Sequence, residues 1–158
     1  MKKPVTAILF ALSFVICFPL TAQNKRIIDS LEKVLPTQPE DTVRFYTLQN
    51  LIVQYRLGNA AKAMELCLEQ QRLAEHIGMP KFIGKALLNT AIQFRKTGDY
   101  ESSVRLHLDA LQQFDKIKDE NNYGNASGSL GITYWQQGNL DLAITYMRKS
   151  LASTIIGS

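Results

Sequence analysis

The sequence contains few of the residues that interrupt regular structure. Its 158 residues include only 9 Gly and 5 Pro, whereas 46% of them are hydrophobic. Collagen-like and low-complexity chains need more glycine and proline, and disordered chains have a smaller apolar share. The composition therefore predicts a chain with a packed core, either one ordinary domain or a linear array of repeats.

Cysteine and excess charge are also scarce. The formal net charge is +4, and it becomes +2 once Lys2 and Lys3 are removed with the leader described below. Nucleic-acid-binding proteins have a clustered basic surface rather than so small a surplus, which argues against a nucleic-acid partner. Removal of the leader also removes Cys17 and leaves Cys67 as the one thiol. An internal disulfide is thereby excluded, and packing alone must stabilise the mature chain.

The start of the chain, 1–22, has the layout of a secretory signal peptide. Lys2 and Lys3 form a positive start, residues 5–18 form an apolar run, and Ala22 offers a small residue for cleavage. A helix that crosses a bilayer needs about 20 apolar residues, so an uncleaved anchor is the weaker interpretation. We expect an exported protein without a stable membrane span in its mature chain, most plainly periplasmic, with full secretion as the alternative.

A constant period organises the rest of the chain. Gly58, Gly98 and Gly138 are evenly spaced, and small residues recur at the same interval. Between the glycines, apolar residues recur every three or four positions, which is the spacing of an amphipathic helix. Glycine suits the left-handed residue that ends a helix, and the Asp or Asn after it can start the next helix. Each unit is therefore predicted to be a helix, a tight turn and a second helix.

The third unit resembles a tetratricopeptide repeat in the stretch SLGITYWQQGNLDLAITYMRKSL, Ser129–Leu151. That motif has small residues at its eighth and twentieth positions and an aromatic residue at its eleventh. The resemblance covers roughly Thr42 to Leu151, and the first unit matches least well. The repeats are lengthened to about 40 residues, beyond the period that is usual for this family.

The first turn should differ from the other two. Tyr55 lies only three residues before Gly58, whereas the later aromatic residues lie four before their glycines, so we expect the first turn to be one residue shorter. The structural repeat positions are Tyr55, Gly58, Ala63, Ala91, Phe94, Gly98, Ser103, Gly131, Tyr134, Gly138 and Ala143.

The resemblance implies an all-α fold in which antiparallel helix hairpins stack into a right-handed α-solenoid. We expect a leading helix that covers the first end of the array. After the last unit no polar capping helix follows, so we expect its apolar side chains to meet a continuation of the protein, a partner or a second copy. The predicted segments are a signal peptide at 1–22, a leading helix and Pro-containing linker at 24–41, repeats at 42–80, 81–120 and 121–154, and a tail at 155–158.

Three side chains that can bind metals occupy one repeat position. Cys67, His107 and Met147 follow one another at intervals of one period, and all three are soft or borderline metal ligands. Neighbouring helices lie about 8–10 Å apart, whereas metal bonds are about 2.0–2.3 Å long. We therefore expect these side chains to pack in the interior, and we expect no metal or other cofactor. His76 is predicted to lie near a helix C-terminus, where a cation is favourable.

Motifs for catalysis are missing. The sequence has no G-x-S-x-G order, no phosphate-binding loop and no HExxH or paired-cysteine motif. No nucleophile, base and orienting group can be assembled from the pattern, so we expect that the protein is not an enzyme.

The resemblance implies instead a concave groove, lined by the first helix of each unit, that holds an extended peptide or a partner helix. Amide side chains in such a groove can donate to and accept from a peptide backbone. Its cations suit an acidic segment or a terminal carboxylate, and a tryptophan can serve as an anchor. The alternative is that these are ordinary solvated residues. Carried over by register, the candidate groove residues are Asn50, Arg56, Lys85, Asn89, Arg95, Lys96, Asn125 and Trp135.

Two functions are consistent with these features. The first is an exported, non-enzymatic scaffold that binds protein or peptide partners, and self-association through the uncapped end is an open alternative for it. The second is the N-terminal periplasmic sensor portion of a bacterial signal-transduction protein, a histidine kinase or transcription regulator, because a signal peptide followed by lengthened repeats is similar to such proteins. An apolar run of about 20 residues encoded after Ser158 would favour the second function.

Overall fold

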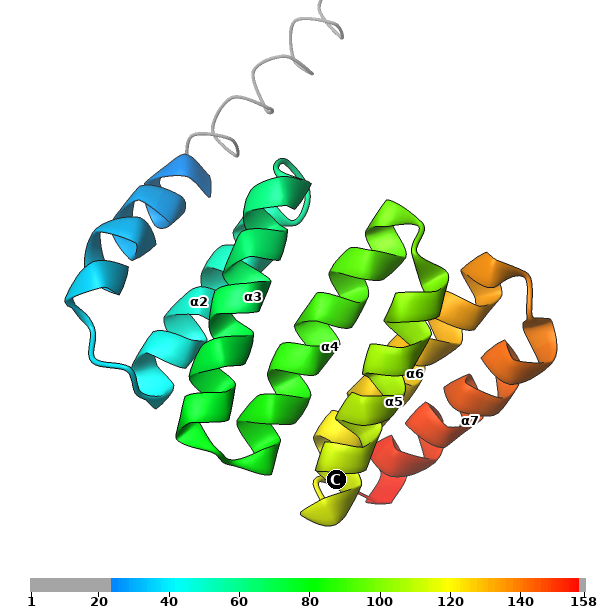
Figure 1. Cartoon of the computed structure of the whole chain (residues 1–158). Coiled ribbons are helices and arrows are strands. Elements are labelled where there is room, and N and C mark those ends of the chain that lie inside the picture. The colour runs from blue at the N-terminus through cyan, green and yellow to red at the C-terminus, as the bar shows by residue number, and fades with distance from the viewer. Residues whose placement is uncertain (1–23, 157–158) are drawn as a thin grey trace, which may run out of the picture. The chain divides into compact units, whose positions relative to one another are not determined.

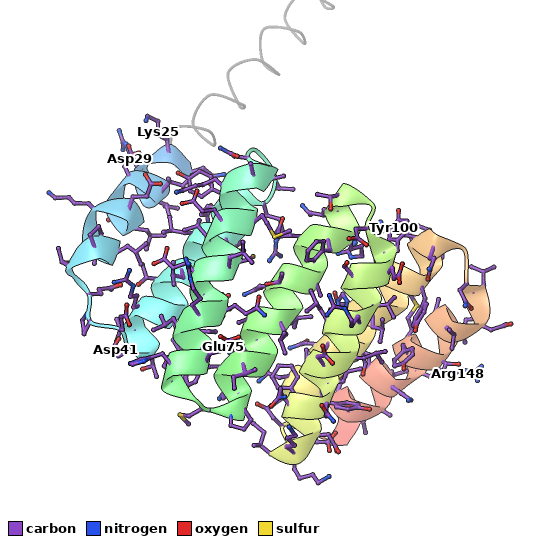
Figure 2. All side chains as sticks on the ribbon, viewed as in Figure 1. Lys25, Asp29, Asp41, Glu75, Tyr100 and Arg148 are labelled. Carbon is purple, nitrogen blue, oxygen red and sulfur yellow. The ribbon has the colours of Figure 1, made fainter. Side chains whose placement is uncertain are left out.

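The computed structural model describes residues 24–156, which fall into two compact units, 24–38 and 39–156. The predicted signal peptide lies outside the described residues. In the first unit, residues 24–34 are helical and a short 3-10 helix, η1 (Leu35–Thr37), follows. Lys25 and Asp29, one turn apart on the first of these helices, form an exposed ion pair at 3.6 Å (Figure 2). That this helix covers one end of the array stays a prediction.

The second unit consists of three helical hairpins. They are α2 (Thr42–Tyr55) with α3 (Ala60–Ile77), α4 (Pro80–Thr97) with α5 (Tyr100–Lys116), and α6 (Glu120–Gln137) with α7 (Leu140–Ile156). Each helix packs against the next one along the chain, so the hairpins follow one another from α2 to α7 (Figure 1). No strand occurs between residues 24 and 156. The predicted all-α solenoid of helical hairpins is confirmed.

Most of these helices begin at a side chain that caps the free backbone N–H groups of the first turn. The carboxylate of Asp41 accepts from the backbone N–H of Val43 at 2.9 Å, and Figure 2 places Asp41 at the start of α2. Asn59, Asp99, Asp119 and Asn139 accept in the same way at the starts of α3, α5, α6 and α7. Such a cap contributes about 1 kcal/mol. Helix α4 begins instead with Pro80, whose missing N–H does no harm in a first turn.

The turns within the second and third hairpins are short because glycine adopts a left-handed conformation there. Gly98 and Gly138 both have φ of 86°, and each donates its backbone N–H to a carbonyl of the preceding helix. The first hairpin differs from our prediction. Helix α2 ends at Tyr55, and the segment from Arg56 to Asn59 connects it to α3. This turn is longer rather than shorter, because Gly58 does not take the left-handed conformation and the helix stops before reaching it.

Small residues let the two helices of a hairpin approach closely. Ala63, Ser103 and Ala143, the predicted column of small residues, are all buried. A Cβ atom built on Gly131 would lie 3.1 Å from the carbonyl oxygen of Ala143, so α6 and α7 pack almost backbone to backbone. In the neighbouring hairpin, a Cβ on Gly84 would lie 2.6 Å from the ring of Phe114. Any larger side chain at these two glycines would push the helices apart.

Candidate binding surface

The first helices of the hairpins form one side of the array. Helix α2 contacts α4, and α4 contacts α6, whereas α3, α5 and α7 make no such contact with one another in the described array. Helices that approach each other on one side only are expected on the inner side of a curved stack. All eight predicted groove residues belong to this side, since they lie on α2, α4 and α6 or at the end of α2.

Three cations gather where α2 and α4 end. Arg56 is the C-cap residue of α2, and Arg95 and Lys96 lie in the last turn of α4. The ammonium group of Lys96 donates to the backbone carbonyl of Arg56 at 3.1 Å. The guanidinium of Arg95 reaches the next hairpin and donates to Oε1 of Gln136 at 3.2 Å. We call Arg56, Arg95 and Lys96 the cation cluster.

A chain of side-chain hydrogen bonds from the interior of the array fixes the guanidinium of Arg56. Its Nη2 donates to Oδ1 of Asn89 at 3.3 Å, and Nδ2 of Asn89 donates to Oε1 of Gln70 at 2.9 Å. Gln70 is fully buried and donates to the backbone carbonyl of Phe45 at 3.2 Å. Asn89 is only 9% exposed, and both its amide nitrogen and its amide oxygen already have partners inside the array. Its predicted contact with a peptide backbone would have to use the remaining amide hydrogen or the second lone pair of Oδ1.

The cation cluster has no acidic counterpart among the described residues. None of its members forms an ion pair within residues 24–156, where the ion pairs involve other cations. Burial lowers the pKa of Arg56, and the positive charge of Arg95 lowers it further. Partial burial likewise lowers the pKa of Lys96, followed by repulsion from Arg56 and Arg95. These shifts mean that the three charges lie close enough to repel one another.

The remaining predicted residues are spread along the same helices without joining the cluster. Asn50 and Asn125 are exposed on α2 and α6. The ammonium of Lys85 lies 5.1 Å above the ring of Tyr46, which links α4 to α2. Trp135 is 59% exposed, too much for a structural tryptophan. The groove assignment of these eight residues stays a prediction.

The sequence of the second half matches a family model. Residues 82–154 match the model described as tetratricopeptide repeat. The second and third hairpins are therefore similar to tetratricopeptide repeats. Proteins of this kind are typically non-enzymatic scaffolds for protein interactions, so the match supports the coarse prediction of a scaffold. No curated protein matches the sequence.

A solved structure shows the same fold. The array is similar to the crystal structure of BtubC (BKLC) from P. vanneervenii, with a TM-score of 0.72 and 18% identity. The match covers 85% of this chain and 57% of that one, so the present chain spans little more than half the length of BtubC. The TPR domain of FLU from Arabidopsis is matched over 84% of this chain and 98% of that one, with 17% identity and a TM-score of 0.49. At 18% identity the likeness to BtubC shows the fold alone.

A second polar group, His107, lies inside the repeat array; its burial was predicted from the sequence, whereas its hydrogen-bond partners were not. His107 is fully buried, and its Nδ1 lies 2.7 Å from the backbone carbonyl of Ser103. Because a carbonyl can only accept, Nδ1 carries the hydrogen and Nε2 accepts from the hydroxyl of Ser129 at 2.9 Å. The pKa of His107 is lowered to about 4, mainly by burial and also by the positive charge of Arg95. The hydrogen bond to Ser103 acts in the opposite direction and raises the pKa. The side chain is therefore a neutral link between α5 and α6.

The repeat position shared by Cys67, His107 and Met147 lies on three successive second helices, α3, α5 and α7. The first two side chains are buried, as predicted, whereas Met147 is 42% exposed because no described helix follows α7. Residues 24–156 contain no group of three His, Cys, Asp or Glu side chains that could hold a metal ion. Burial raises the pKa of the Cys67 thiol to about 12, so this thiol stays protonated and is a poor nucleophile.

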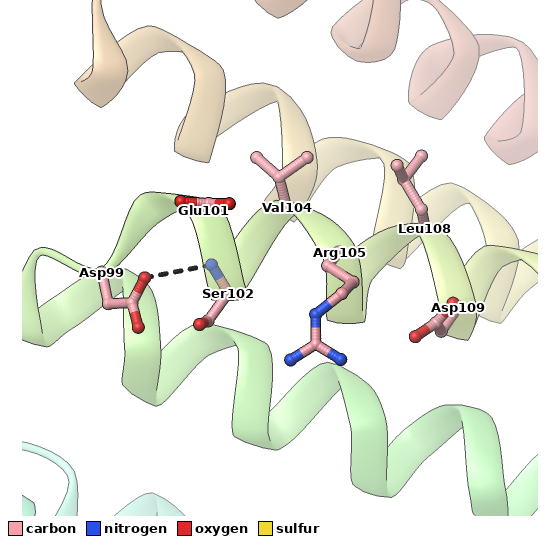
Figure 3. Close-up of a pocket in the computed structure, with 7 residues that line it drawn as sticks. All are labelled: Asp99, Glu101, Ser102, Val104, Arg105, Leu108 and Asp109. Atoms are coloured by element: carbon pink, nitrogen blue, oxygen red, sulfur yellow. Dashed lines mark hydrogen bonds between the residues drawn. The ribbon is translucent and has the colours of Figure 1, made fainter.

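A wide hollow on the surface lies over a single helix. Asp99 and residues of α5 line it (Figure 3). The carboxylate of Asp99 is committed to the helix cap, where it accepts from Ser102 at 3.0 Å. Val104 and Leu108 form its apolar part, and the Ser102 side chain hydrogen-bonds the Asp99 carboxylate. The polar groups beside this hollow therefore serve the start of α5.

Helix α7 exposes an apolar face. The corresponding face of α5 carries Val104, His107 and Leu111 and packs against α6, which places these residues in the core or against it. The residues of α7 that correspond to these three, one repeat later, are exposed. No helix within residues 24–156 is long and apolar enough to span a membrane. The exposed apolar residues of α7 are Leu140, Leu142, Ile144, Met147, Leu151 and Ile155.

Proposed function

We propose that this protein is a non-enzymatic scaffold whose surface of first helices, α2, α4 and α6, binds an acidic peptide or partner helix. The observation that carries the proposal is the cation cluster, which has no acidic counterpart among residues 24–156. Exposed residues flank it along the same surface, among them Trp135, which supplies a large apolar contact. A segment with carboxylates would satisfy the free donors of this surface through charge-assisted hydrogen bonds.

The proposal is tested by selecting binders from a random library of short peptides displayed on phage, with the mature chain from Gln23 to Ser158 as the target. Selected sequences are expected to be rich in Asp and Glu. Their affinity, measured by fluorescence anisotropy, should fall at least about tenfold in Arg95→Glu with Lys96→Glu, since two attractive charges become repulsive. Circular dichroism of the double variant checks that helicity does not change.

The matched control reverses two charges elsewhere. Arg105 on α5 and Arg148 on α7 are exposed, and Figure 2 shows Arg148 at the edge of the third hairpin. Arg105→Glu with Arg148→Glu alters the net charge by the same amount and should leave binding within about twofold. An equal loss of affinity in both double variants would show a general effect of net charge. Undiminished binding by Arg95→Glu with Lys96→Glu would show that the peptides bind another surface. Either result would overturn the proposal.

Export is part of the same proposal. Its support is the signal-peptide layout of residues 1–22, and we propose the periplasm as the destination. Expressed at full length in a Gram-negative host, the protein should be recovered from the periplasm with Gln23 as its first residue. Recovery in the cytoplasm with Met1 retained would contradict export and leave the binding proposal unaffected.

The second candidate function, a sensor portion of a signalling protein, is favoured by the apolar face of α7. A helix that packs on α7 as α6 packs on α5 would cover Ile144, Met147 and Leu151, and in a sensor that helix would belong to the segment leading to the membrane. Sequencing of the coding region beyond Ser158 tests this candidate. A further hairpin followed by about 20 apolar residues would support it. A second, separately encoded protein that covers α7 would favour the plain scaffold.

A further inference from the structure

We infer that the cation cluster is a subsite for a compact dianion, of which a phosphate monoester is the type. The inference rests on the proposed function, because it assigns a ligand group to one place on the same surface. It goes beyond an acidic segment in general by stating the charge and the shape of the group that the subsite binds.

The first argument is the set of free donors. The Nε atoms of Arg56 and Arg95 are both buried and have no acceptor among the residues that the structure describes. Each guanidinium uses one terminal nitrogen for a neighbouring amide, on Asn89 and on Gln136. A buried donor without an acceptor costs free energy, and charged donors cost the most. The other terminal nitrogen of each guanidinium has no acceptor among the described residues, so a group with several acceptor oxygens in a small volume would accept from both arginines at once.

The second argument is the sum of charges. Arg56, Arg95 and Lys96 contribute three positive charges at the C-terminal ends of α2 and α4. Each helix C-terminus is equivalent to roughly half a negative charge, so two of them reduce the total to about +2. A single carboxylate would leave about one positive charge uncompensated. A phosphate monoester carries between about −1.5 and −2 near pH 7 and compensates nearly all of it.

The third argument is that the cluster is held in place before a ligand arrives. Asn89 and the buried Gln70 fix the terminal nitrogen of Arg56, and Gln136 fixes that of Arg95. Lys96 is anchored to the carbonyl of Arg56. Arginine side chains that are already ordered lose little further entropy on binding, and their planar forks match phosphate geometry.

The test uses the mature chain, Gln23 to Ser158, and three probes: inorganic phosphate, acetate, and a short glycine peptide with one central phosphoserine. Binding is followed by NMR through the Nε–Hε signals of the arginines. At pH 7.5 and matched ionic strength, phosphate should shift the signals of Arg56 and Arg95 much more than the same concentration of acetate does. Affinity for the phosphopeptide should fall at pH 5, because the phosphate takes up its second proton with a pKa of about 6.

Variants separate the subsite from general electrostatics. Arg56→Gln and Arg95→Gln should each weaken phosphate binding about tenfold, the loss expected for one charge-assisted hydrogen bond pair. Lys96→Gln keeps the interior hydrogen bonds and should weaken binding less, which provides a variant that folds even if Arg56→Gln does not. Arg105→Gln and Arg148→Gln, the matched controls on α5 and α7, should bind as the unaltered protein does.

The outcomes identify the source of the phosphate and keep this inference separate from the proposed function. Tighter binding of the phosphopeptide than of phosphate would support a phosphorylated segment, and equal binding would support a free phosphate group. Acidic peptides that bind this surface while phosphate shifts neither arginine signal would overturn the inference alone. Phosphate binding without any peptide binding would overturn only the scaffold proposal. Equal shifts with acetate, or equal losses in the control variants, would overturn the dianion subsite.

Discussion

The two interfaces between hairpins use the same repeat positions with different chemistry. At the interface of α3 with α4, Cys67 is buried and Asn89 links Gln70 to Arg56. At the interface of α5 with α6, His107 occupies the position of Cys67, and it hydrogen-bonds Ser129 where the first interface has Asn89. The first interface therefore places a permanent charge at its edge, and the second has a neutral, titratable group at its centre.

This difference shows what the repeat does and does not determine. Close helix packing requires a side chain of limited size at the position of Cys67 and His107, and both are fully buried. Any polar atom enclosed there must then find a partner in the following hairpin, because an unpaired polar atom is costly. The repeat thus determines which positions are buried, and the individual residues determine whether the interface responds to pH or binds an anion.

The first prediction has the largest expected effect and concerns the stability of the protein at acid pH. His107 has a pKa of about 4 in the folded protein, lowered by burial, and about 6.5 when unfolded. Below pH 6.5 the unfolded chain takes up a proton that the folded chain excludes. Stability present above pH 6.5 should be lost as the pH falls, by about 2 kcal/mol at pH 5 and roughly 3 kcal/mol at pH 4. The measurement is urea unfolding from pH 7.5 to pH 4.

Two histidine variants isolate this effect from the titration of carboxylates. His107→Gln lacks the titrating group, so between pH 6.5 and pH 5 its stability should change much less than that of the parent. His76, the other histidine, is exposed in the last turn of α3, and His76→Gln should keep the full dependence on pH. Hydrogen exchange should show α6 and α7 opening first. If the stability of the unaltered protein and that of His107→Gln depended on pH in the same way, the interface would not discriminate between neutral and protonated His107.

The second prediction breaks one hydrogen-bonded link in each interface. Asn89→Ala removes the acceptor of Arg56 and the donor to Gln70 and should reduce stability by about 2–3 kcal/mol, since one lost bond is to a charged group. Ser129→Ala removes only the hydroxyl that donates to His107 and should reduce stability by about 1 kcal/mol. Both are measured by urea unfolding at pH 7.5. An equal effect of the two substitutions would mean that the bond to Arg56 contributes nothing beyond packing.

The succession of helices could be predicted from the sequence because it depends on local features. Glycines followed by Asp or Asn mark the turns at Gly98 and Gly138, and apolar residues at helical spacing mark the faces that pack. The first turn was predicted wrongly because Gly58 was aligned with the other two glycines, whereas α2 ends at Tyr55. Alignment by period does not show where a helix loses its last hydrogen bond.

The interior hydrogen bonds could not be predicted from the same pattern, because they depend on which side chains meet across hairpins. Asn89 was assigned to the groove by register, yet its neighbour in space is Gln70. One signal was present: Gln70 shares the helical face of Leu66, Cys67, Leu73 and Ala74, where a polar side chain must be buried. That signal predicts a partner for Gln70 but does not say which residue supplies it.

The smallest expected effect concerns the two turns that connect one hairpin to the next, which we call the links. The link from α3 to α4 places Gly78 at φ of 71°, and the link from α5 to α6 places Lys118 at φ of 54°. The left-handed region is strained for residues with a Cβ atom, so Lys118→Gly should relieve strain and raise the melting temperature by about 2 °C, after allowance for the flexibility that glycine adds to the unfolded chain.

The substitution Gly78→Lys in the other link is the reverse experiment. A Cβ on Gly78 would meet nothing closer than a carbonyl oxygen at 3.9 Å, so Gly78→Lys introduces backbone strain without a steric clash and should lower the melting temperature. Asp115→Asn removes the exposed ion pair between Asp115 and Lys118 and measures its share separately. If Lys118→Gly lowered the melting temperature while Asp115→Asn left it unchanged, the strain at Lys118 would be smaller than the flexibility gained by the unfolded chain. The two links would then be equivalent, and the difference between the interfaces would lie in their side chains alone.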